Sequence, residues 1–239
     1  MIINFAKRSF KEIVRDPLSI IFSILLPLFL LIIFQQFKIP NEIYSIVNFT
    51  PGIIIFSLSF ITMFTATLVS KDRNTALLTR LCVSPMKSYQ YILGYIFSLM
   101  PMVIIQNIIF FGVAAFLGLN VSLNIFYTIL LTIIISPLFI LLGILIGSIT
   151  SEKAASGASS IVVQLVAFTS GMYFSVDMVG NAFKKICEIL PFKNILDLIR
   201  FSLNNSSISF YTLINIIVWF FVITFLTVIV FKNKMISEK

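Results

Sequence analysis

Residues 88–151 contain no charged side chain. About 20 apolar residues in a helix are enough to cross the hydrocarbon core of a bilayer, so a run of this length predicts two successive membrane-spanning helices. The turn-forming residues Gly118, Asn120 and Asn124 divide the run near its middle. The composition agrees with a membrane protein, since 59% of the residues are hydrophobic and 11% are charged.

The other uncharged runs are long enough to give six spans in total, which would place both termini on one side of the membrane. We predict an all-α integral membrane fold that forms one transmembrane domain over residues 1–239. The expected spans are 17–37, 50–70, 90–117, 125–150, 154–176 and 209–231. Three further helical segments are expected outside the spans, at 1–16, 71–85 and 177–206.

The basic residues predict the orientation, because Lys and Arg are retained in cytoplasmic segments close to the membrane. With the N-terminus inside, few of the 17 Lys and Arg residues would lie outside, namely Lys38, Lys184, Lys185, Lys193 and Arg200. We therefore expect a multi-pass protein of the plasma membrane with both termini in the cytoplasm. The net charge is +8, and the basic residues lie beside apolar runs. There they would meet anionic lipid headgroups rather than nucleic acid.

Segment 1–16 has the pattern of an amphipathic helix. Its apolar face comprises Ile2, Ile3, Phe5, Ala6, Phe10, Ile13 and Val14. The opposite face comprises Lys7, Arg8, Lys11, Glu12 and Arg15. We expect a helix that lies in the inner membrane interface. The alternative is a cytoplasmic extension of the first span, although Asp16-Pro17 favours a break between the two.

Segment 71–85 is a polar island between the second and third spans. Its leucines Leu77, Leu78 and Leu81 recur at helical spacing, and Ser84-Pro85 would end a helix. Three charged residues flank the leucines: Asp72, Arg73 and Arg80. Such a helix could fill a groove on a partner protein. A solvated loop with cytoplasmic charges is the alternative.

No catalytic, cofactor or metal site is predicted on this chain. The sequence has no His and no G-x-x-x-x-G-K-[ST] phosphate loop. None of the nine acidic residues falls inside an expected span. Ion-coupled carriers and intramembrane enzymes usually need such a group, so both classes are disfavoured.

Several short motifs occur in an order that resembles the permease subunit of ABC-2 type ABC transporters. They are "LCVSP" at 81–85, "YILGY" at 91–95, "SGMYFSVDMV" at 170–179 and "ILPFKNILDLIR" at 189–200. The resemblance covers nearly the whole chain. It departs at residues 76–79, which read Ala-Leu-Leu-Thr where many members have Gly-Thr-x-Glu.

The resemblance implies that two permease chains, identical or related, pair in the membrane above two cytoplasmic ABC ATPase subunits. ATP and Mg would be bound by the ATPase subunits. Segment 71–85 would act as a coupling helix that transmits closure of the nucleotide sites to the spans. The residues implied in this contact are Asp72, Arg73, Leu77, Leu78, Arg80, Leu81, Ser84 and Pro85.

The external segment 177–206 has its own apolar periodicity, at Val179, Phe183, Ile186 and Leu190. We predict an amphipathic helix that forms one arm of a re-entrant hairpin turned by Pro191. By resemblance the surrounding residues would gate the exit for a lipid-like substrate: Gly171, Tyr173, Phe174, Phe183, Leu190, Pro191 and Phe192. Alternatively, the helix only covers the outer ends of the spans.

Four polar residues fall within expected spans: Gln106, Asn107, Gln164 and Asn215. They are expected to make interhelical hydrogen bonds or to contact substrate. The run of small residues at 154–160 allows close approach of backbones, either within the chain or at a dimer interface.

Together these patterns predict the permease subunit of an ATP-driven exporter of an amphiphilic drug, antimicrobial peptide or lipid-like compound. The alternative cargo is a cell-envelope polysaccharide. The alternative function is an ATP-independent six-span channel or carrier.

Overall fold

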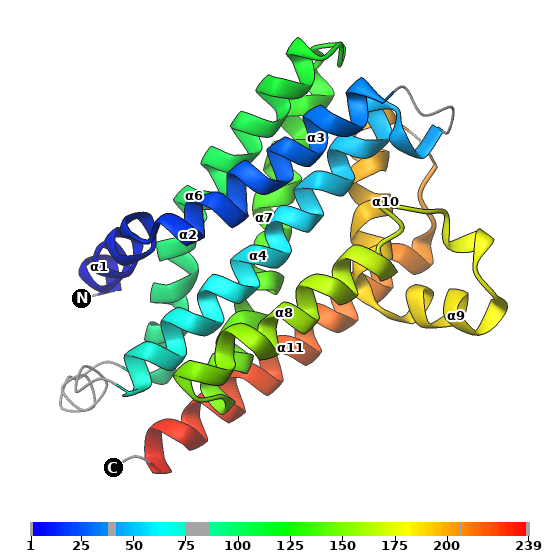
Figure 1. Ribbon diagram of the computed structural model, residues 1–239. Coiled ribbons are helices and arrows are strands. Elements are labelled where there is room, and N and C mark those ends of the chain that lie inside the picture. The colour runs from blue at the N-terminus through cyan, green and yellow to red at the C-terminus, as the bar shows by residue number, and fades with distance from the viewer. Residues whose placement is uncertain (1, 38–41, 75–86, 206, 238–239) are drawn as a thin grey trace.

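The computed structural model describes residues 2–37, 42–74, 87–205 and 207–237, and within these ranges the chain is helical with no strand. The long helices run side by side as one bundle (Figure 1). Helix α1 and the final helix α11, Phe210–Ser237, reach the same end of this bundle. We call this the α1 end, and we call the opposite end, where α9 lies, the α9 end.

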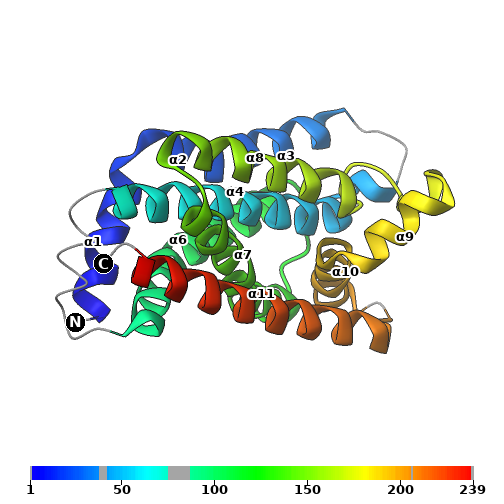
Figure 2. The same ribbon diagram turned by 90° about the horizontal axis from the view of Figure 1, so that it is seen from below.

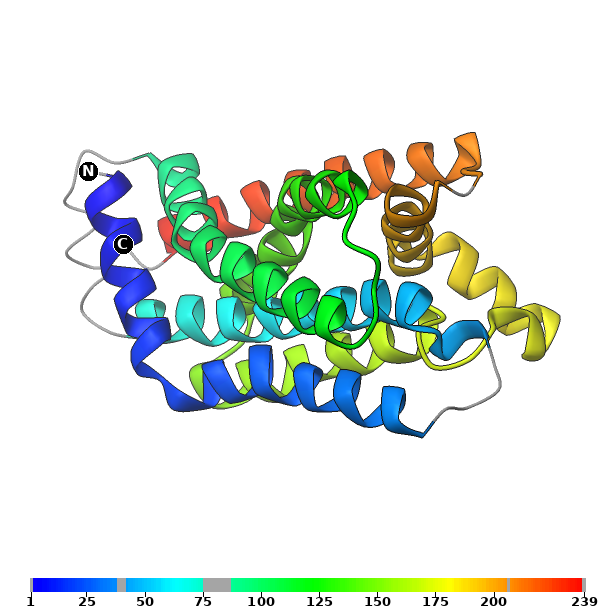
Figure 3. The same cartoon turned by 90° about the horizontal axis from the view of Figure 1, so that it is seen from above.

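Helix α1 spans Ile2–Arg15 and lies across the end of the bundle rather than along it (Figures 2 and 3). Residues next to the break explain why α1 ends there. Asp16 has an extended backbone, and its side chain accepts hydrogen bonds from Leu18 N at 3.2 Å and Ser19 Oγ at 2.7 Å. An Asp cap followed by Pro17 at the first helical position is a strong helix start. The separate N-terminal helix is therefore present.

The first span is continuous from Pro17 to Gln36 but changes winding along its length. It comprises α2 (Pro17–Ile20), a π-helical turn (Ile21–Leu25) and α3 (Leu26–Gln36). Pro27 has no N–H to donate to the carbonyl of Ser23, four residues earlier. That carbonyl instead accepts a hydrogen bond from Ser57 Oγ at 2.7 Å. A neighbouring helix thus satisfies the acceptor that the proline leaves open.

Helix α4, Ile46–Asn74, is the centre of the bundle, with 89% of its most apolar stretch buried. It packs against α3, α6, α7, α8 and α10. The helix is longer than the predicted span 50–70: Pro51 lies within its first turns, and it continues past Ser70 without a break. Residues 71–74 therefore extend this span, and the prediction that a separate helix begins at 71 is wrong for them.

Helices α6 (Ser88–Phe116) and α7 (Leu123–Ile149) follow, close to the predicted spans 90–117 and 125–150. Two glycines bring α7 against α4. A Cβ on Gly143 would lie 2.5 Å from the Thr62 carbonyl oxygen, and one on Gly147 would lie 2.5 Å from that of Ala66. The spacing of four residues places both glycines on one face, the small-residue pattern that lets membrane helices touch.

Helix α8, Glu152–Thr169, ends earlier than the predicted span 154–176. Five helices in the described ranges are long and apolar enough to cross a membrane, and α8 is not one of them. Its first turns carry Glu152, Lys153 and small polar residues, which lower its hydropathy. It nevertheless packs along α4 in the same bundle.

The run of small residues at 154–160 packs within the chain on one side of α8. Ala155 and Ser159 are fully buried, whereas nothing lies within 4 Å of a Cβ built on Gly157. Small side chains thus serve intrachain packing on the face toward α4. The dimer interface suggested for the other face stays a prediction.

Two short helices connect α8 to α11 at the α9 end. They are α9 (Asn181–Ile189) and α10 (Pro191–Asn204), which meet at Leu190-Pro191 in a corner (Figure 1). Helix α9 lies at the edge of the molecule, whereas α10 packs against α4, α7 and α11. The predicted turn at Pro191 is present. The re-entrant hairpin stays a prediction.

Candidate functional site

The last described turn of α4 joins three other helices at the α1 end. We call this arrangement the α4 junction and define it by six residues: Arg8, Glu12, Lys71, Asp72, Arg73 and Tyr95.

Asp72 is the centre of the α4 junction, with only 1% of its surface exposed. Its Oδ1 accepts a hydrogen bond from Arg8 Nη2 at 2.7 Å, and its Oδ2 accepts one from the Tyr95 hydroxyl at 2.9 Å. A buried carboxylate is costly unless it is paired and hydrogen-bonded, and here both oxygens have partners from different helices. Asp72 therefore ties α1 and α6 to the end of α4.

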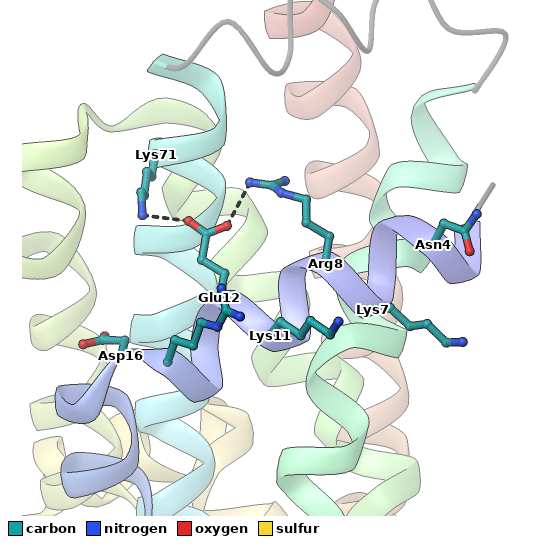
Figure 4. Close-up of a pocket in the computed structure, with 8 residues that line it drawn as sticks. Asn4, Lys7, Arg8, Lys11, Glu12, Asp16 and Lys71 are labelled. Carbon is teal, nitrogen blue, oxygen red and sulfur yellow. Dashed lines mark hydrogen bonds and ion pairs between the residues drawn. The ribbon is translucent and has the colours of Figure 1, made fainter.

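Arg8 and Lys71 share a second carboxylate. Glu12 accepts from Arg8 Nη2 at 2.8 Å and from Lys71 Nζ at 2.7 Å (Figure 4). Burial alone would lower the pKa of Arg8, but the hydrogen bond to Asp72 and the charges of Asp72 and Glu12 raise it overall. These partly exposed pairs are typically worth about 0 to 1 kcal/mol each.

An aromatic contact positions α1 for this pairing. The ring of Phe5 packs edge-on against Tyr95 at 4.9 Å and against Tyr91 at 5.7 Å between centroids. It fills the space beside Gly94, where a Cβ would come within 2.5 Å of the Phe5 ring. The segment Tyr91–Tyr95, chosen from the sequence only for its resemblance to a family motif, therefore forms the docking surface for α1.

Arg73 attaches the same turn of α4 to the end of α7. Its Nη1 donates to the carbonyl oxygens of Gly147, Ser148 and Thr150, at 3.0, 2.6 and 3.3 Å. The last carbonyls of a helix have no intrahelical donors and carry a partial negative charge, so a guanidinium there is favourable. Arg73 thus caps α7.

Asp72 and Arg73 were expected to flank a coupling helix and to meet an ATPase. In the structure their charged groups contact neighbouring helices of the same chain. A charge count cannot distinguish a solvated charge from one buried against a neighbouring helix, and a contact of these two residues with an ATPase stays a prediction. The other predicted coupling residues lie outside the described residues: Leu77, Leu78, Arg80, Leu81, Ser84 and Pro85.

The residues predicted as an external gate separate into three groups. Tyr173 belongs to the first group: its carbonyl accepts from the Tyr44 hydroxyl at 2.6 Å, and Gly171 nearby has a positive φ of 81°. Phe174 and Phe183 form the second, with ring centroids 6.4 Å apart.

The third group is the corner between α9 and α10, Leu190-Pro191-Phe192. Phe192 is buried and packs against Phe139 of α7 at 6.1 Å. The seven gate residues therefore lie around the α9 end without forming one cluster, and their role as a gate stays a prediction.

The four polar residues expected in spans also have different environments. Asn215 of α11 donates to the carbonyl of Ile189 at 2.9 Å, so it caps the end of α9. Asn107 donates to the carbonyl of Val103 within its own helix. Gln106 is fully buried, and neither of its amide atoms is hydrogen-bonded within the described part of the chain. Gln164 lies on the exposed face of α8.

The described residues contain no group of three or more His, Cys, Asp or Glu side chains that could hold a metal ion. At the α4 junction, charged contacts fix the end of one central helix. Residues 75–86 continue the chain directly from this turn.

Residues 2–204 match the family model described as ABC-2 type transporter. The chain belongs to the ABC-2 type transporter family. No individual curated protein matches it. This ABC-2 chain is a multi-pass membrane protein of the permease type, and domains of this type have no ATPase site of their own.

Family membership confirms the resemblance drawn from the short motifs. ABC-2 permeases normally work with an ATPase subunit. The sequence did not predict that Tyr95, Arg8 and Glu12 contact residues 71–73 in the last described turn of α4. Their signal was present, because Arg8 and Glu12 stand four residues apart on the polar face of α1. Nothing in the sequence placed that face beside Asp72.

Proposed function

We propose that this chain is the permease subunit of an ABC exporter that moves an amphiphilic drug, antimicrobial peptide or lipid-like compound out of the cell. Two copies of a separate ATPase would bind ATP and Mg and drive the cycle. Two permease chains would form the pathway, with both termini in the cytoplasm. Export of a cell-envelope polysaccharide is the second candidate cargo.

The α4 junction is the observation that carries this proposal. The buried central helix α4 leads directly into segment 75–86, and its last turn is fixed to α1 and α6 through Asp72 and to α7 through Arg73. A force applied by an ATPase to segment 75–86 would therefore act on several helices together. A free cytoplasmic loop would have no need for such attachments.

The groove beside α11 supports an amphiphilic cargo. It is an open, mainly apolar hollow of about 370 Å³ lined by Ile189, Tyr211, Ile214, Asn215, Val218, Trp219 and Val222. Asn215 and Trp219 donate to the Ile189 carbonyl at its edge. An apolar wall with a few polar groups suits a molecule with both characters.

The decisive experiment purifies the permease in lipid with a candidate ABC ATPase subunit and screens amphiphiles for stimulation of ATP hydrolysis. The proposal expects a stable complex and at least one stimulating compound. A purified chain that transports such a compound without any ATPase would overturn it in favour of a channel or carrier.

A pair of variants tests segment 75–86 as the contact with the ATPase. Leu78→Asp with Leu81→Asp should insert normally but lose the ATPase in pull-down, because burying a leucine in a groove is typically worth about 2 to 5 kcal/mol. Arg80→Ala should do less, since an exposed charge pair is worth about 0 to 1 kcal/mol. Retention of the partner and of stimulated hydrolysis in the double variant would exclude this segment as the coupling element.

A further inference from the structure

The polar face of α1 forms one side of an open hollow of about 840 Å³ at the α1 end. It is lined by Asn4, Lys7, Arg8, Lys11, Glu12, Arg15, Asp16 and Lys71. Figure 4 shows Asn4, Lys7 and Lys11 following one another along α1, with Glu12 between Arg8 and Lys71. Five basic side chains thus share this surface with two carboxylates.

Three of the five cations are not used by the α4 junction. We call Lys7, Lys11 and Arg15 the basic row, since they recur every four residues on one face of α1. All three are exposed, and no ion pair or hydrogen bond joins their side chains to another described residue. The two nearest carboxylates are occupied, because Glu12 binds Arg8 and Lys71 and Asp16 caps α2. Within the described part of the chain, the basic row therefore has no anionic partner.

An exposed apolar flank lies directly beside the basic row on the same helix. It comprises Ile3, which is 70% exposed, Val14, which is 41% exposed, and the half-buried Phe10. The opposite side of α1, with Phe5 and Ile13, is buried against the bundle. The flank is therefore a second apolar surface of α1, and the described part of the chain leaves it largely uncovered.

The placement of α1 selects the kind of molecule that covers this flank. The helix lies across the end of the spans (Figure 3). The exposed face of the first span begins at Leu18, which is 57% exposed, immediately after α1. A helix with a basic face and an apolar flank at the end of spanning helices lies where hydrocarbon meets headgroups. A soluble acidic protein would match the charges but not the flank.

We propose that the basic row binds the phosphate of an anionic phospholipid, whose acyl chains lie along the apolar flank of α1. Lys7 and Lys11 act as compact charges and Arg15 as a two-pronged donor to phosphate oxygens. Asn4 adds an uncharged donor at the end of the hollow. The assignment does not depend on the transported substrate.

The test measures lipid retention by native mass spectrometry on the purified full chain. Phosphatidylglycerol and phosphatidylcholine with the same acyl chains are added at equal concentration. The wild-type chain is expected to retain phosphatidylglycerol preferentially. Because each basic residue near an anionic surface favours association roughly fivefold, Lys7→Gln with Lys11→Gln and Arg15→Gln should lower this preference by at least about tenfold.

The matched control removes three exposed basic residues from other helices. Lys153→Gln, Lys185→Gln and Lys232→Gln change the net charge equally but leave the basic row intact. This control should keep the preference of the wild-type chain. An equal loss in the control, or an unchanged preference in the basic-row variant, would overturn the proposal.

Two further arms guard against misfolding and identify the source of the anion. Lys7→Arg with Lys11→Arg should keep the preference for phosphatidylglycerol. Raising the salt concentration should weaken this preference in the wild-type chain. Both measurements test the proposal even if the glutamine variant misfolds. Soluble glycerophosphoglycerol or inorganic phosphate should fail to compete at the same concentration. Competition equal to that of the lipid, or displacement of bound lipid by the ATPase, would show another occupant and refute the lipid assignment.

Discussion

Asp72 joins three helices at the α1 end. Its charge is buried at the end of a central helix, where it is held by a guanidinium from α1 and a phenol from α6. A buried pair of this kind gives little net stability when intact, but removing one partner leaves the other charge uncompensated. The effects of substitution are therefore expected to be strongly asymmetric.

A double-mutant cycle tests this asymmetry. Arg8→Ala should lower the free energy of unfolding by about 3 kcal/mol, the low end of the range for a broken buried pair, because Arg8 itself is partly exposed. Asp72→Ala should cost less than Arg8→Ala, since the freed guanidinium can reach water. Arg8→Ala with Asp72→Ala should fall short of the sum of the single changes by at least about 1 kcal/mol.

The measurement is detergent-based chemical unfolding at low salt. Lys71→Ala is the control, because its pair with Glu12 is half exposed and should be worth less than about 1 kcal/mol. Additive single effects of Arg8 and Asp72 would mean that their contact contributes nothing to stability.

Cys187 gives a second prediction at this scale. The side chain is fully buried, and this burial raises the pKa of its thiol. The thiolate is the reactive form, so a raised pKa leaves less of it at neutral pH. A maleimide should therefore label native Cys187 slowly at pH 7, faster at pH 9, and fully only after denaturation. Rapid labelling of native Cys187 at pH 7 would show that α9 opens from its packed position.

Among the elements, α4 and α7 form the closest pair. Gly143 and Gly147 let the two backbones touch, and Arg73 caps the end of α7 from α4. Because backbone atoms of Thr62 and Ala66 occupy the space where a Cβ would sit, no side-chain movement can relieve a larger residue there. These two helices should move as one unit.

Alanine substitutions test this packing. Gly143→Ala and Gly147→Ala should each destabilise the fold by about 1 to 3 kcal/mol through overpacking. Gly112→Ala and Gly157→Ala are matched controls in helices where nothing lies within 4 Å, and they should be neutral or slightly stabilising. Melting temperatures in one detergent compare the four variants. Equal shifts would mean that helix propensity, not contact, determines the result.

The sequence predicted elements better than contacts. The long uncharged run predicted α6 and α7 within two residues at each end, because hydropathy directly reflects the bilayer. It misplaced the end of α4, because the charges of Lys71, Asp72 and Arg73 were taken to mean solvent. Whether a charge is solvated or paired depends on neighbours distant in sequence, here Arg8 and the end of α7. Hydropathy also overestimated the length of α8, whose first turns contain small and polar residues.

At the scale of the whole molecule, α1 and the end of α11 lie at the same end of the bundle. This predicts that both termini lie on one side of the membrane, which labelling can test. Lys11→Cys and Lys185→Cys, each in a Cys82→Ala, Cys187→Ala background, place one exposed thiol at each end of the bundle. An impermeant maleimide should label Lys185→Cys in intact cells, and Lys11→Cys only after permeabilisation. Labelling of Lys11→Cys from outside would reverse the predicted orientation.

The hydroxyl groups of α4 bear on how the protein is made. The chain is synthesised from its N-terminus, so α4 is made before α6, α7, α8 and α10, the later helices that bury it. Five of its hydroxyls donate to carbonyls three or four residues earlier: Thr50 to Ile46, Ser59 to Phe56, Thr65 to Ile61, Thr67 to Phe64 and Ser70 to Thr67. These donors carry their own acceptors into the bilayer, where water is absent. These hydroxyls of α4 therefore do not depend on the later helices for their hydrogen bonds.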